Sequence, residues 1–255
     1  MKLAYNKPDY YEIALSKLRH PKRDVDFFES VIRKFSQRNV KSILEIGCGN
    51  SPYLEEIGRR QYHFVGLDLN KNMLQFSAEK ARRLGFQFTG FQRDMMKFTL
   101  PLKVDFAFVL FDSVYRNSNQ HFLDHLACVA RALQKGSLYV LHMVVEGDLG
   151  EIEGKWTETH RFPDKLIIKT SYERNVIDFS RQLRRDTLTL KVNDKGKKYT
   201  FKESNIEKFI LPQEFLLLVE KSHFEFLEWY DGFDMKKRFN ESKSTEYVAC
   251  VLRKK

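Results

Sequence analysis

Two glycines and a carboxylate, placed at the ends of two apolar runs, are the residues of this chain best suited to chemistry. The first run, residues 42–46, enters the turn Gly47-Cys48-Gly49. A second run, residues 63–67, ends at Asp68. Glycine lets a backbone approach its ligand closely, and an acid at the end of the neighbouring strand can reach a ribose. The pattern predicts a nucleoside pocket at the edge of a parallel α/β sheet.

The turn departs from the dinucleotide-binding pattern. That pattern, Gly-x-Gly-x-x-Gly, needs a third glycine close to the pyrophosphate, and Pro52 stands at that position here. A dinucleotide ligand is therefore disfavoured.

The same turn closely resembles motif I of the class I S-adenosylmethionine-dependent methyltransferases, an acid-x-Gly-x-Gly sequence. Asp68 stands in the place of the ribose-binding acid of that family. The resemblance implies that Glu45, Gly47 and Gly49 cradle the methionine end of the cofactor S-adenosylmethionine (SAM). Many members carry a further glycine where this chain has Ser51. The resemblance implies an enzyme with SAM as its cofactor.

Other cofactor contacts are implied at the ends of later strands. Asp94 stands where the acid of the family accepts the adenine amino group, and Met95 supplies the following backbone amide. The resemblance implies that the backbone at Asp112 lies alongside the methionine moiety, where its carboxylate could attract a cationic amine or the ammonium group of the cofactor. Helix capping for Asp68 and Asp112, and a loop carboxylate balancing Arg93 for Asp94, are the structural alternatives. The predicted cofactor-binding residues are Glu45, Gly47, Cys48, Gly49, Asp68, Leu69, Asp94, Met95, Phe111, Asp112 and Tyr10.

Catalytic residues are not defined by the sequence, because methyl transfer from a sulfonium needs mainly positioning and desolvation. His142, towards the end of the fifth strand, could take a proton near neutral pH, or it could be a buried, hydrogen-bonded histidine. Tyr10 and Tyr115 carry aromatic faces that suit a sulfonium, or they could pack on the core. No metal-ligand motif is present, so no metal is expected.

Hydrophobic periodicity predicts an α/β fold with a doubly wound, seven-stranded, mostly parallel sheet that ends in an antiparallel hairpin. Class I methyltransferases close with such a hairpin, and the resemblance covers about residues 40–145 and 209–255. The expected helices are 23–35, 52–60, 70–84, 121–133 (capped by Gly136) and one from Pro212. The expected strands are 42–46, 64–68, 86–91, 104–111, 137–145, 224–230 and 247–252.

An insertion of different character interrupts this pattern. Extended segments at 166–173, 179–192 and 199–202, with a turn at Asp194-Lys195-Gly196, predict a small antiparallel sheet. This resembles the β lid of a subgroup of small-molecule and uncharacterised prokaryotic methyltransferases. The expected domains are a helical cover at 1–40, a SAM-binding core at 41–147 and 205–255, and an acceptor lid at 148–204.

The charge of the chain is concentrated in the insertion. The formal net charge is +10, and residues 154–203 hold 13 Lys or Arg against 7 Asp or Glu, a net of +6. A solvated surface would explain this charge, and so would a polyanionic partner such as RNA. If the insertion meets the acceptor, then Arg184, Arg185, Lys197 and Lys198 are expected to affect acceptor use.

The leading prediction is in-line transfer of a methyl group from SAM to nitrogen or oxygen of a small molecule. The alternatives are a methyltransferase that modifies RNA or protein through the basic insertion, and a non-catalytic SAM-binding protein. Phe111-Asp112-Ser113 stands where amino methyltransferases acting on adenine or glutamine commonly carry Asn-Pro-Pro-Tyr or Asp-Pro-Pro-Tyr. The chain also lacks the Pro-Cys nucleophile of cytosine C5 methylation. Both chemistries are disfavoured.

Composition bounds the remaining possibilities. A chain of 255 residues with 42% hydrophobic residues can form one large domain with an elaboration. Three widely spaced cysteines fit a reducing compartment. No apolar stretch approaches the roughly 18 residues of a membrane span, and the amino terminus has no signal-like apolar region. We expect a soluble, cytoplasmic protein without a membrane partner; the sequence does not indicate its oligomeric state.

Overall fold

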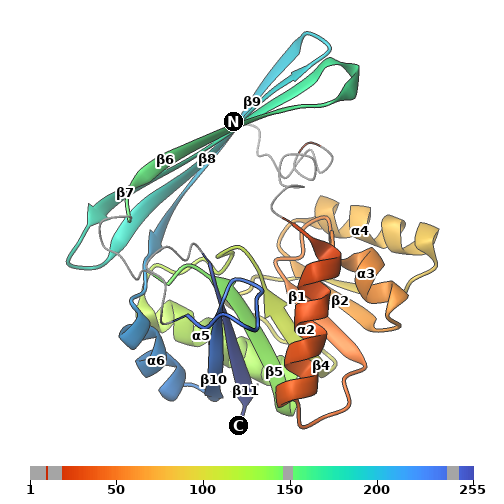
Figure 1. Ribbon diagram of the computed structural model, residues 1–255, viewed down its shortest axis with the longest axis vertical. Helices are drawn as coiled ribbons and strands as arrows, with labels where there is room; N and C mark the ends of the chain where they lie inside the picture. The colour runs from red at the N-terminus through yellow and green to blue at the C-terminus, as the bar shows by residue number, and fades with distance from the viewer. Residues whose placement is uncertain (1–9, 11–18, 146–151, 240–246) are drawn as a thin grey trace. The chain divides into compact units, whose positions relative to one another are not determined.

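The chain divides into two compact units. The computed structural model describes residues 10, 19–145, 152–239 and 247–255. One unit, which we call the core, comprises His20–Gly147 and Ile210–Lys255, and the other comprises Met1–Arg19 and Asp148–Phe209. Each is described by itself below, with the element labels of Figure 1.

The core is built on a seven-stranded sheet with the order β10-β11-β5-β4-β1-β2-β3. The neighbours among β1 to β5 run parallel, whereas β11 is antiparallel to both β5 and β10. This confirms the predicted α/β fold and its closing hairpin. The strands are β1 Ser42–Ile46, β2 His63–Asp68, β3 Phe88–Gln92, β4 Val104–Val109, β5 Leu133–Met143, β10 Phe224–Asp231 and β11 Val248–Lys254.

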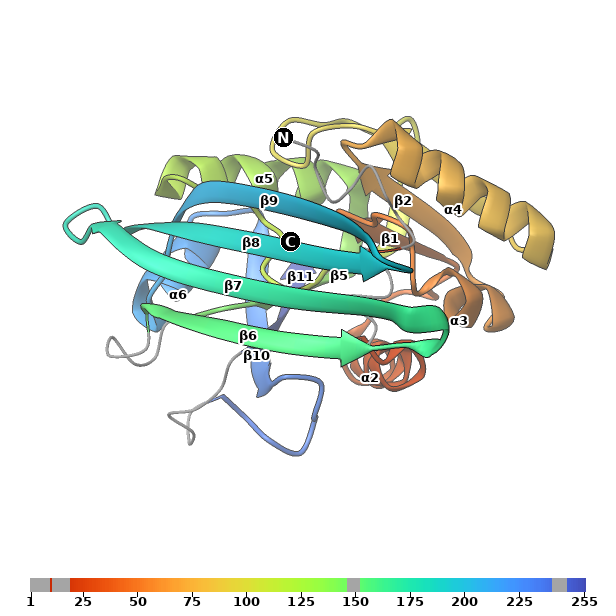
Figure 2. The same ribbon diagram turned by 90° about the horizontal axis from the view of Figure 1, so that it is seen from above.

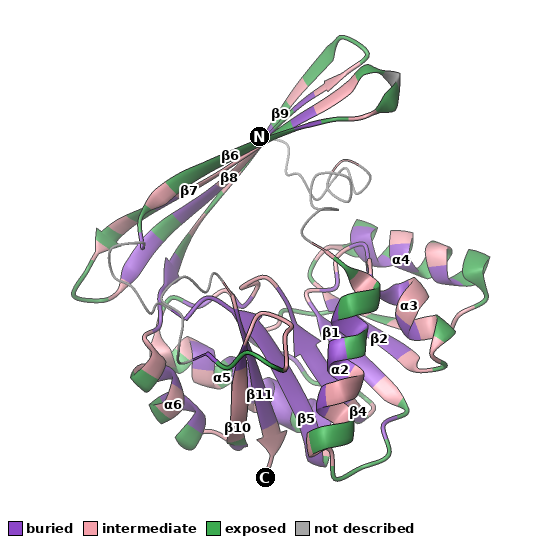
Figure 3. Ribbon diagram, viewed as in Figure 1, coloured by how far each residue is buried: buried purple, intermediate pink, exposed green. Residues whose placement is uncertain are grey.

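Apolar side chains cover both faces of this sheet, because successive residues of a strand point to opposite faces. Ile43 packs in a cluster with residues of α2 and α3, whereas Leu44 packs in a second cluster with residues of α5 and α6. Figure 3 shows the central strands as buried. The helices are α2 Pro21–Phe35, α3 Leu54–Arg59, α4 Lys71–Leu84, α5 Asn119–Ala132 and α6 Pro212–Glu220. None of the described helices combines the length and apolarity of a membrane span.

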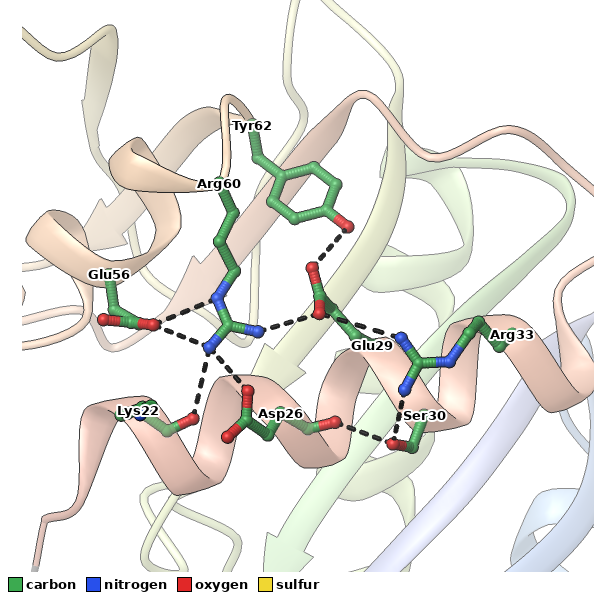
Figure 4. A network of polar contacts seen from close by, with 8 residues as sticks. All are labelled: Lys22, Asp26, Glu29, Ser30, Arg33, Glu56, Arg60 and Tyr62. Carbon is green, nitrogen blue, oxygen red and sulfur yellow. Dashed lines mark hydrogen bonds and ion pairs between the residues drawn. The ribbon is translucent and has the colours of Figure 1, made fainter.

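An ion-pair network ties α2 to the end of α3 (Figure 4). The Arg60 guanidinium lies 2.6 Å from Glu56, 2.7 Å from Asp26 and 2.8 Å from Glu29. Tyr62 donates to the other oxygen of Glu29 at 3.3 Å. Several charges sharing one arginine stabilise more than isolated surface pairs do, so this network fixes α2 against the helix that follows the glycine turn.

Of two helix ends, one matches the sequence expectation and one differs from it. The C-cap of α4 is Gly85 at φ +73°, as predicted, because glycine adopts the left-handed region without strain. Helix α5, however, ends at Ala132 and passes directly into β5 at Leu133. The predicted cap at Gly136 is therefore wrong: this residue, at φ +80°, lies inside β5, where it faces Gln37.

The second unit is an antiparallel sheet of four strands in sequence order, shown from above in Figure 2. Its strands are β6 Gly154–Arg161, β7 Leu166–Asp178, β8 Leu183–Asp194 and β9 Lys197–Lys208. The predicted turn at Asp194 to Gly196 joins β8 and β9, with Lys195 and Gly196 at φ 51° and 89°. Strand β6 was not predicted, because its sequence Lys-Trp-Thr-Glu-Thr-His lacks an apolar alternation.

Candidate functional site

The glycine turn after β1 is held against β2 by its own backbone. The amides of Gly47 and Cys48 donate to the carbonyl oxygen of Leu67 at 2.7 and 3.0 Å. Gly47 and Gly49 lie at φ +69° and +51°, a region that side chains with a Cβ disfavour. A Cβ on Gly47 would lie 3.3 Å from the Met95 Cε atom. Glycine therefore suits position 47 for both its conformation and its close packing, and position 49 for its conformation.

Asp68 links this turn to the end of β2. One carboxylate oxygen accepts the Gly49 amide at 2.7 Å, and the other accepts the Asn70 amide at 2.8 Å. Burial raises the pKa of Asp68, and the backbone amides partly oppose that rise. The cap of α4 is Asn70, whose side chain accepts the amides of Asn72 and Met73. Asp68 thus stands at the turn and is not the cap of the helix.

Two further residues of the turn are buried. The Glu45 side chain comes from the last part of β1 and is 4% exposed. Burial raises the pKa of the Cys48 thiol far above its usual range, and the carboxylates of Glu45 and Asp68 add to the rise. Cys48 is therefore a neutral thiol that packs in the turn, where thiolate chemistry is disfavoured.

The ends of β2 and β3 are joined beside the turn. The Arg93 amide donates to the Asp68 carbonyl oxygen at 3.1 Å, and the Gln92 side chain donates to the Leu69 carbonyl oxygen at 3.2 Å. The Leu69 side chain is 69% exposed, an apolar surface beside the acid. Asp94 is exposed, and its carboxylate accepts the Met96 amide at 2.9 Å.

A buried relay that the sequence did not reveal supports the segment after β3. The Nδ1 atom of His125 lies 2.9 Å from the Met95 carbonyl oxygen, and its Nε2 atom lies 2.6 Å from the Tyr139 hydroxyl. Because a carbonyl only accepts, Nδ1 carries the proton and Nε2 accepts from Tyr139. Burial lowers the pKa of His125 to about 4, which keeps the ring neutral. In the sequence, the position of His125 three residues after Phe122 indicates burial on the inner stripe of the helix, but not its partners.

After β4 the chain turns sharply beside β5. Phe111 and Asp112 lie at φ 55° and 52°, an uncommon region for residues with a Cβ. The Phe111 amide donates to Nδ1 of His142 at 3.3 Å, and the Asp112 amide donates to the His142 carbonyl oxygen at 3.0 Å. His142 therefore holds this strained turn in place.

Asp112 and His142 have structural partners that the sequence did not reveal. Asp112 lies 2.8 Å from the guanidinium of Arg116, which is 1% exposed, so its carboxylate is already committed to a buried cation. It does not cap α5 either, because the N-cap is Ser118. His142 is 4% exposed and is stacked against Phe233 and Tyr247, with ring centroids at 4.2 and 4.9 Å.

Burial lowers the pKa of His142 to about 3, so this ring is too weakly basic to act as a general base near neutral pH. Its geometry is that of the buried, hydrogen-bonded histidine. Tyr115 is half-buried in the loop after β4.

Tyr10 belongs to the unit that contains the antiparallel sheet. Its hydroxyl donates to Asp194 at 2.7 Å, and its ring centroid lies 6.1 Å from that of Tyr199. These contacts describe a tyrosine that packs on that sheet.

The core therefore brings together Gly47, Cys48, Gly49 and Asp68, with Met95 beside them. They lie where β1 has β4 on one side and β2 on the other. In doubly wound sheets ligands bind at this reversal of strand order, at the carboxyl ends of the strands. Among the residues that the structure describes, no group of three or more His, Cys, Asp or Glu side chains could hold a metal ion.

Comparisons with known proteins identify a domain family and solved structures of the same fold. Residues 43–136 match the family model described as "Methyltransferase domain". A comparison with curated proteins finds no match.

Solved structures with the same fold include a SAM-dependent methyltransferase from Clostridium acetobutylicum. It is 18% identical, with 98% of each chain covered and a TM-score of 0.80. Another is CalS10, an amino pentose methyltransferase from Micromonospora echinaspora, at 17% identity, 96% coverage of both chains and a TM-score of 0.72. A third is the sugar N-methyltransferase KedS8 from Streptoalloteichus, at 14% identity, with 96% of this chain and 93% of that chain covered and a TM-score of 0.76.

The matched domain, the shared fold and the glycine turn with its acid agree with one another. They identify residues 43–136 as a methyltransferase domain and support an enzyme with SAM as its cofactor.

Proposed function

We propose that the chain transfers a methyl group from SAM, by in-line displacement, to an amine nitrogen of a small-molecule acceptor that carries a sugar. The observation that carries the cofactor assignment is the 2.7 Å hydrogen bond between the Gly49 amide and Asp68. It places a carboxylate directly beside a glycine turn at the reversal of strand order.

The residues present fit SAM. Each Asp68 oxygen accepts one backbone amide and keeps lone-pair capacity for a ribose hydroxyl. A Cβ on Gly47 would lie 3.3 Å from the end of the Met95 side chain, and glycine avoids this close contact beside the turn. Leu69 offers an exposed apolar surface for the adenine ring. Glu45 precedes the turn, whereas Asp68 bonds Gly49 at its other end, and the Glu45 carboxylate suits the ammonium group of the methionine moiety.

Bound there, SAM supplies a methyl group on a sulfonium, already activated for displacement. The protein then needs chiefly to orient an acceptor and exclude water. The strained turn at Phe111 and Asp112, held by His142, provides a rigid wall beside β4. In this proposal the residues of the core contribute to the reaction by holding the cofactor and the acceptor in fixed positions.

The weak basicity of His142 favours nitrogen as the acceptor atom, because it removes His142 as a base for a hydroxyl acceptor. A hydroxyl acceptor must lose its proton as it attacks, which calls for a base with a pKa near the working pH. The pKa of His142, about 3, is far below that range. A neutral amine already carries an available lone pair. The named activities of CalS10 and KedS8, an amino pentose methyltransferase and a sugar N-methyltransferase, support an amino sugar as the acceptor class.

Mass spectrometry with methyl-labelled SAM tests this proposal. The acceptors are pairs of sugar nucleotides and glycosides that differ only in carrying an amino or a hydroxyl group at one position. We expect the label on the nitrogen of the amino member and none on its hydroxyl partner. Label on oxygen, or no transfer from a protein that calorimetry shows to bind SAM, would contradict the proposal.

A further inference from the structure

The two faces of the antiparallel sheet formed by β6, β7, β8 and β9 are chemically unlike. One face carries a buried apolar cluster of Ile168, Leu190, Val192 and Phe201, against which Tyr10 and Tyr199 pack. Residues on the same face further along include Arg174, whose guanidinium lies 5.1 Å from the Trp156 ring. This face is occupied by the packing of its own unit.

The opposite face, which we call the basic face, is exposed and positively charged. Cross-strand register assigns its residues, since directly opposed residues share a face. Its exposed basic residues are Lys155, Arg161, Lys169, Arg185, Lys191, Lys198 and Lys202. Its acids within the described strands are Glu173, which pairs with Lys155 at 3.7 Å, and Asp178, which is opposed to Leu183 at the end of β7. The basic side chains are all exposed.

The placement of these cations is unfavourable without a partner. Lys169 and Lys191 are directly opposed on neighbouring strands. Like charges in this position repel each other and destabilise the sheet. An anion bound between them would remove that repulsion. Arg184, which the sequence suggested as part of this surface, is instead on the other face, buried and 3.0 Å from Asp186.

Hydroxyl groups alternate with the cations on the basic face. Thr157 bonds Ser171 at 2.9 Å, and Thr187 bonds Ser204 at 3.0 Å. Thr159 and Thr200 flank the Lys169–Lys191 pair in the register. Lysines and hydroxyls are the groups that contact phosphate and sugar in nucleic-acid complexes. No aromatic residue lies on this face among the described strand residues, so it offers no platform for stacking unpaired bases.

We propose that the basic face docks double-stranded RNA through its phosphates and 2′-hydroxyls. A-form RNA presents both groups across its wide minor groove and is recognised by shape and backbone rather than by base edges. The face supplies cations for the phosphates and threonine or serine hydroxyls for the 2′-hydroxyls. A second copy of this chain is disfavoured as the occupant, because stacking two basic faces would oppose their like charges.

Fluorescence anisotropy with the full chain tests the proposal. The probe is an RNA duplex of about 20 base pairs, longer than the roughly 16 that duplex-binding domains span. Binding is measured between about 50 and 200 mM salt for the wild type and for the double variant K169Q/K191Q. We expect about a tenfold loss of affinity and a salt slope smaller by about two, because each lysine releases about one counterion.

The matched control is R82Q/R83Q, which removes two exposed cations from the last turn of α4 in the core. Its affinity and salt slope should equal those of the wild type. K169R/K191R should also bind normally. If K169Q/K191Q does not fold, the single variant K202Q replaces it. The slope of its RNA affinity against salt concentration should be smaller than that of the wild type by about one. SAM binding by calorimetry checks that each variant is folded.

Several results would overturn the proposal. These are unchanged RNA binding by K169Q/K191Q, an equal loss in R82Q/R83Q, and equal affinity for a DNA duplex of the same sequence. Binding to vesicles of anionic phospholipid without binding to RNA would assign the face to a membrane surface instead. Loss of a wild-type dimer in K169Q/K191Q, seen by sedimentation, would assign it to a second copy.

Discussion

The Gly49 amide and the Asp68 carboxylate lie 2.7 Å apart, which joins the turn after β1 to the end of β2. A charge-assisted hydrogen bond of this kind is shorter and stronger than a neutral one. The bond orients the carboxylate, while burial raises its pKa. The acid is therefore preorganised to receive a neutral, hydroxyl-bearing ligand such as a ribose.

Acidification should destabilise the protein through its buried histidines. The folded-state pKa values of His125 and His142 are lowered from 6.5 to about 4 and about 3, so the unfolded chain takes up protons first. Stability is therefore full above pH 6.5 and falls as the pH drops towards 4. Each histidine should cost about 1.4 kcal/mol per pH unit in this window. Urea unfolding at several pH values measures the slope.

The variant H125Q is the control for that slope. Between pH 6.5 and 4 the free energy of unfolding of H125Q should fall about half as steeply with pH as that of the wild type, because only His142 then contributes. A slope that H125Q leaves unchanged would show that His125 does not stay neutral in the folded protein.

The relay through His125 should position the segment around Met95, which we propose binds the adenine. Tyr139→Phe removes the donor to His125, and H125A also removes the partner of the Met95 carbonyl. We expect SAM affinity to fall several-fold in the first variant and about tenfold in the second, since a hydrogen bond contributes about 1 kcal/mol. Calorimetry with 5′-methylthioadenosine separates this role from a general loss of structure. The affinity of that fragment should fall by the same factor, whereas an unaffected fragment would refute a role in holding the adenine.

The Asp112–Arg116 pair should be structural, because the arginine is buried. Removing one partner of a buried ion pair costs about 3–5 kcal/mol. D112A should lose stability in that range, and the double variant D112A/R116M should regain much of it. Denaturant unfolding measures both. The exposed Asp124 on α5 is the comparison, and D124A should change stability by less than about 0.5 kcal/mol. Equal stability of D112A and D124A would contradict the pairing.

The two motif glycines give a matched pair. Both have positive φ, but a Cβ on Gly47 would meet Met95, whereas one on Gly49 would have open space around it. G49A should therefore show only backbone strain, about 1 kcal/mol. G47A should show the same strain and should lose more SAM affinity than G49A, because its Cβ would also push against the Met95 side chain. Thermal unfolding and calorimetry distinguish the two, and an equal effect of both substitutions would rule out the Met95 contact as the cause.

Much of the core could be predicted because its signals are local. The apolar run from Val104 predicts a strand over 104–111, and β4 at Val104–Val109 is that strand, buried along most of its length. The glycine turn and Asp68 were predicted as neighbours because parallel strands place their carboxyl ends at one edge. The structure brings them within hydrogen-bonding distance.

The sequence did not reveal features that depend on partners distant in the chain. Nothing local distinguishes His125 from an ordinary residue of an inner helix stripe, because its partners Met95 and Tyr139 lie in other elements. Arg184 counted as surface charge in the sequence, but strand pairing places it beside Asp186 in a buried position. Strand β6 carries too few apolar residues to be recognised from the sequence. It forms a strand because it pairs along its length with β7, a contact that the local sequence does not encode.

Calorimetric titration of SAM into the wild type and D68A tests the central claim most directly. Asp105 is the matched control: it also accepts two backbone amides, those of Lys41 and Ser42, but at the beginning of β4. We predict that D68A binds SAM at least about tenfold more weakly, as expected for the loss of hydrogen bonds to a charged group. D105A should retain wild-type affinity. Unchanged affinity in D68A, or an equal loss in D105A, would contradict the assignment of Asp68 to the cofactor.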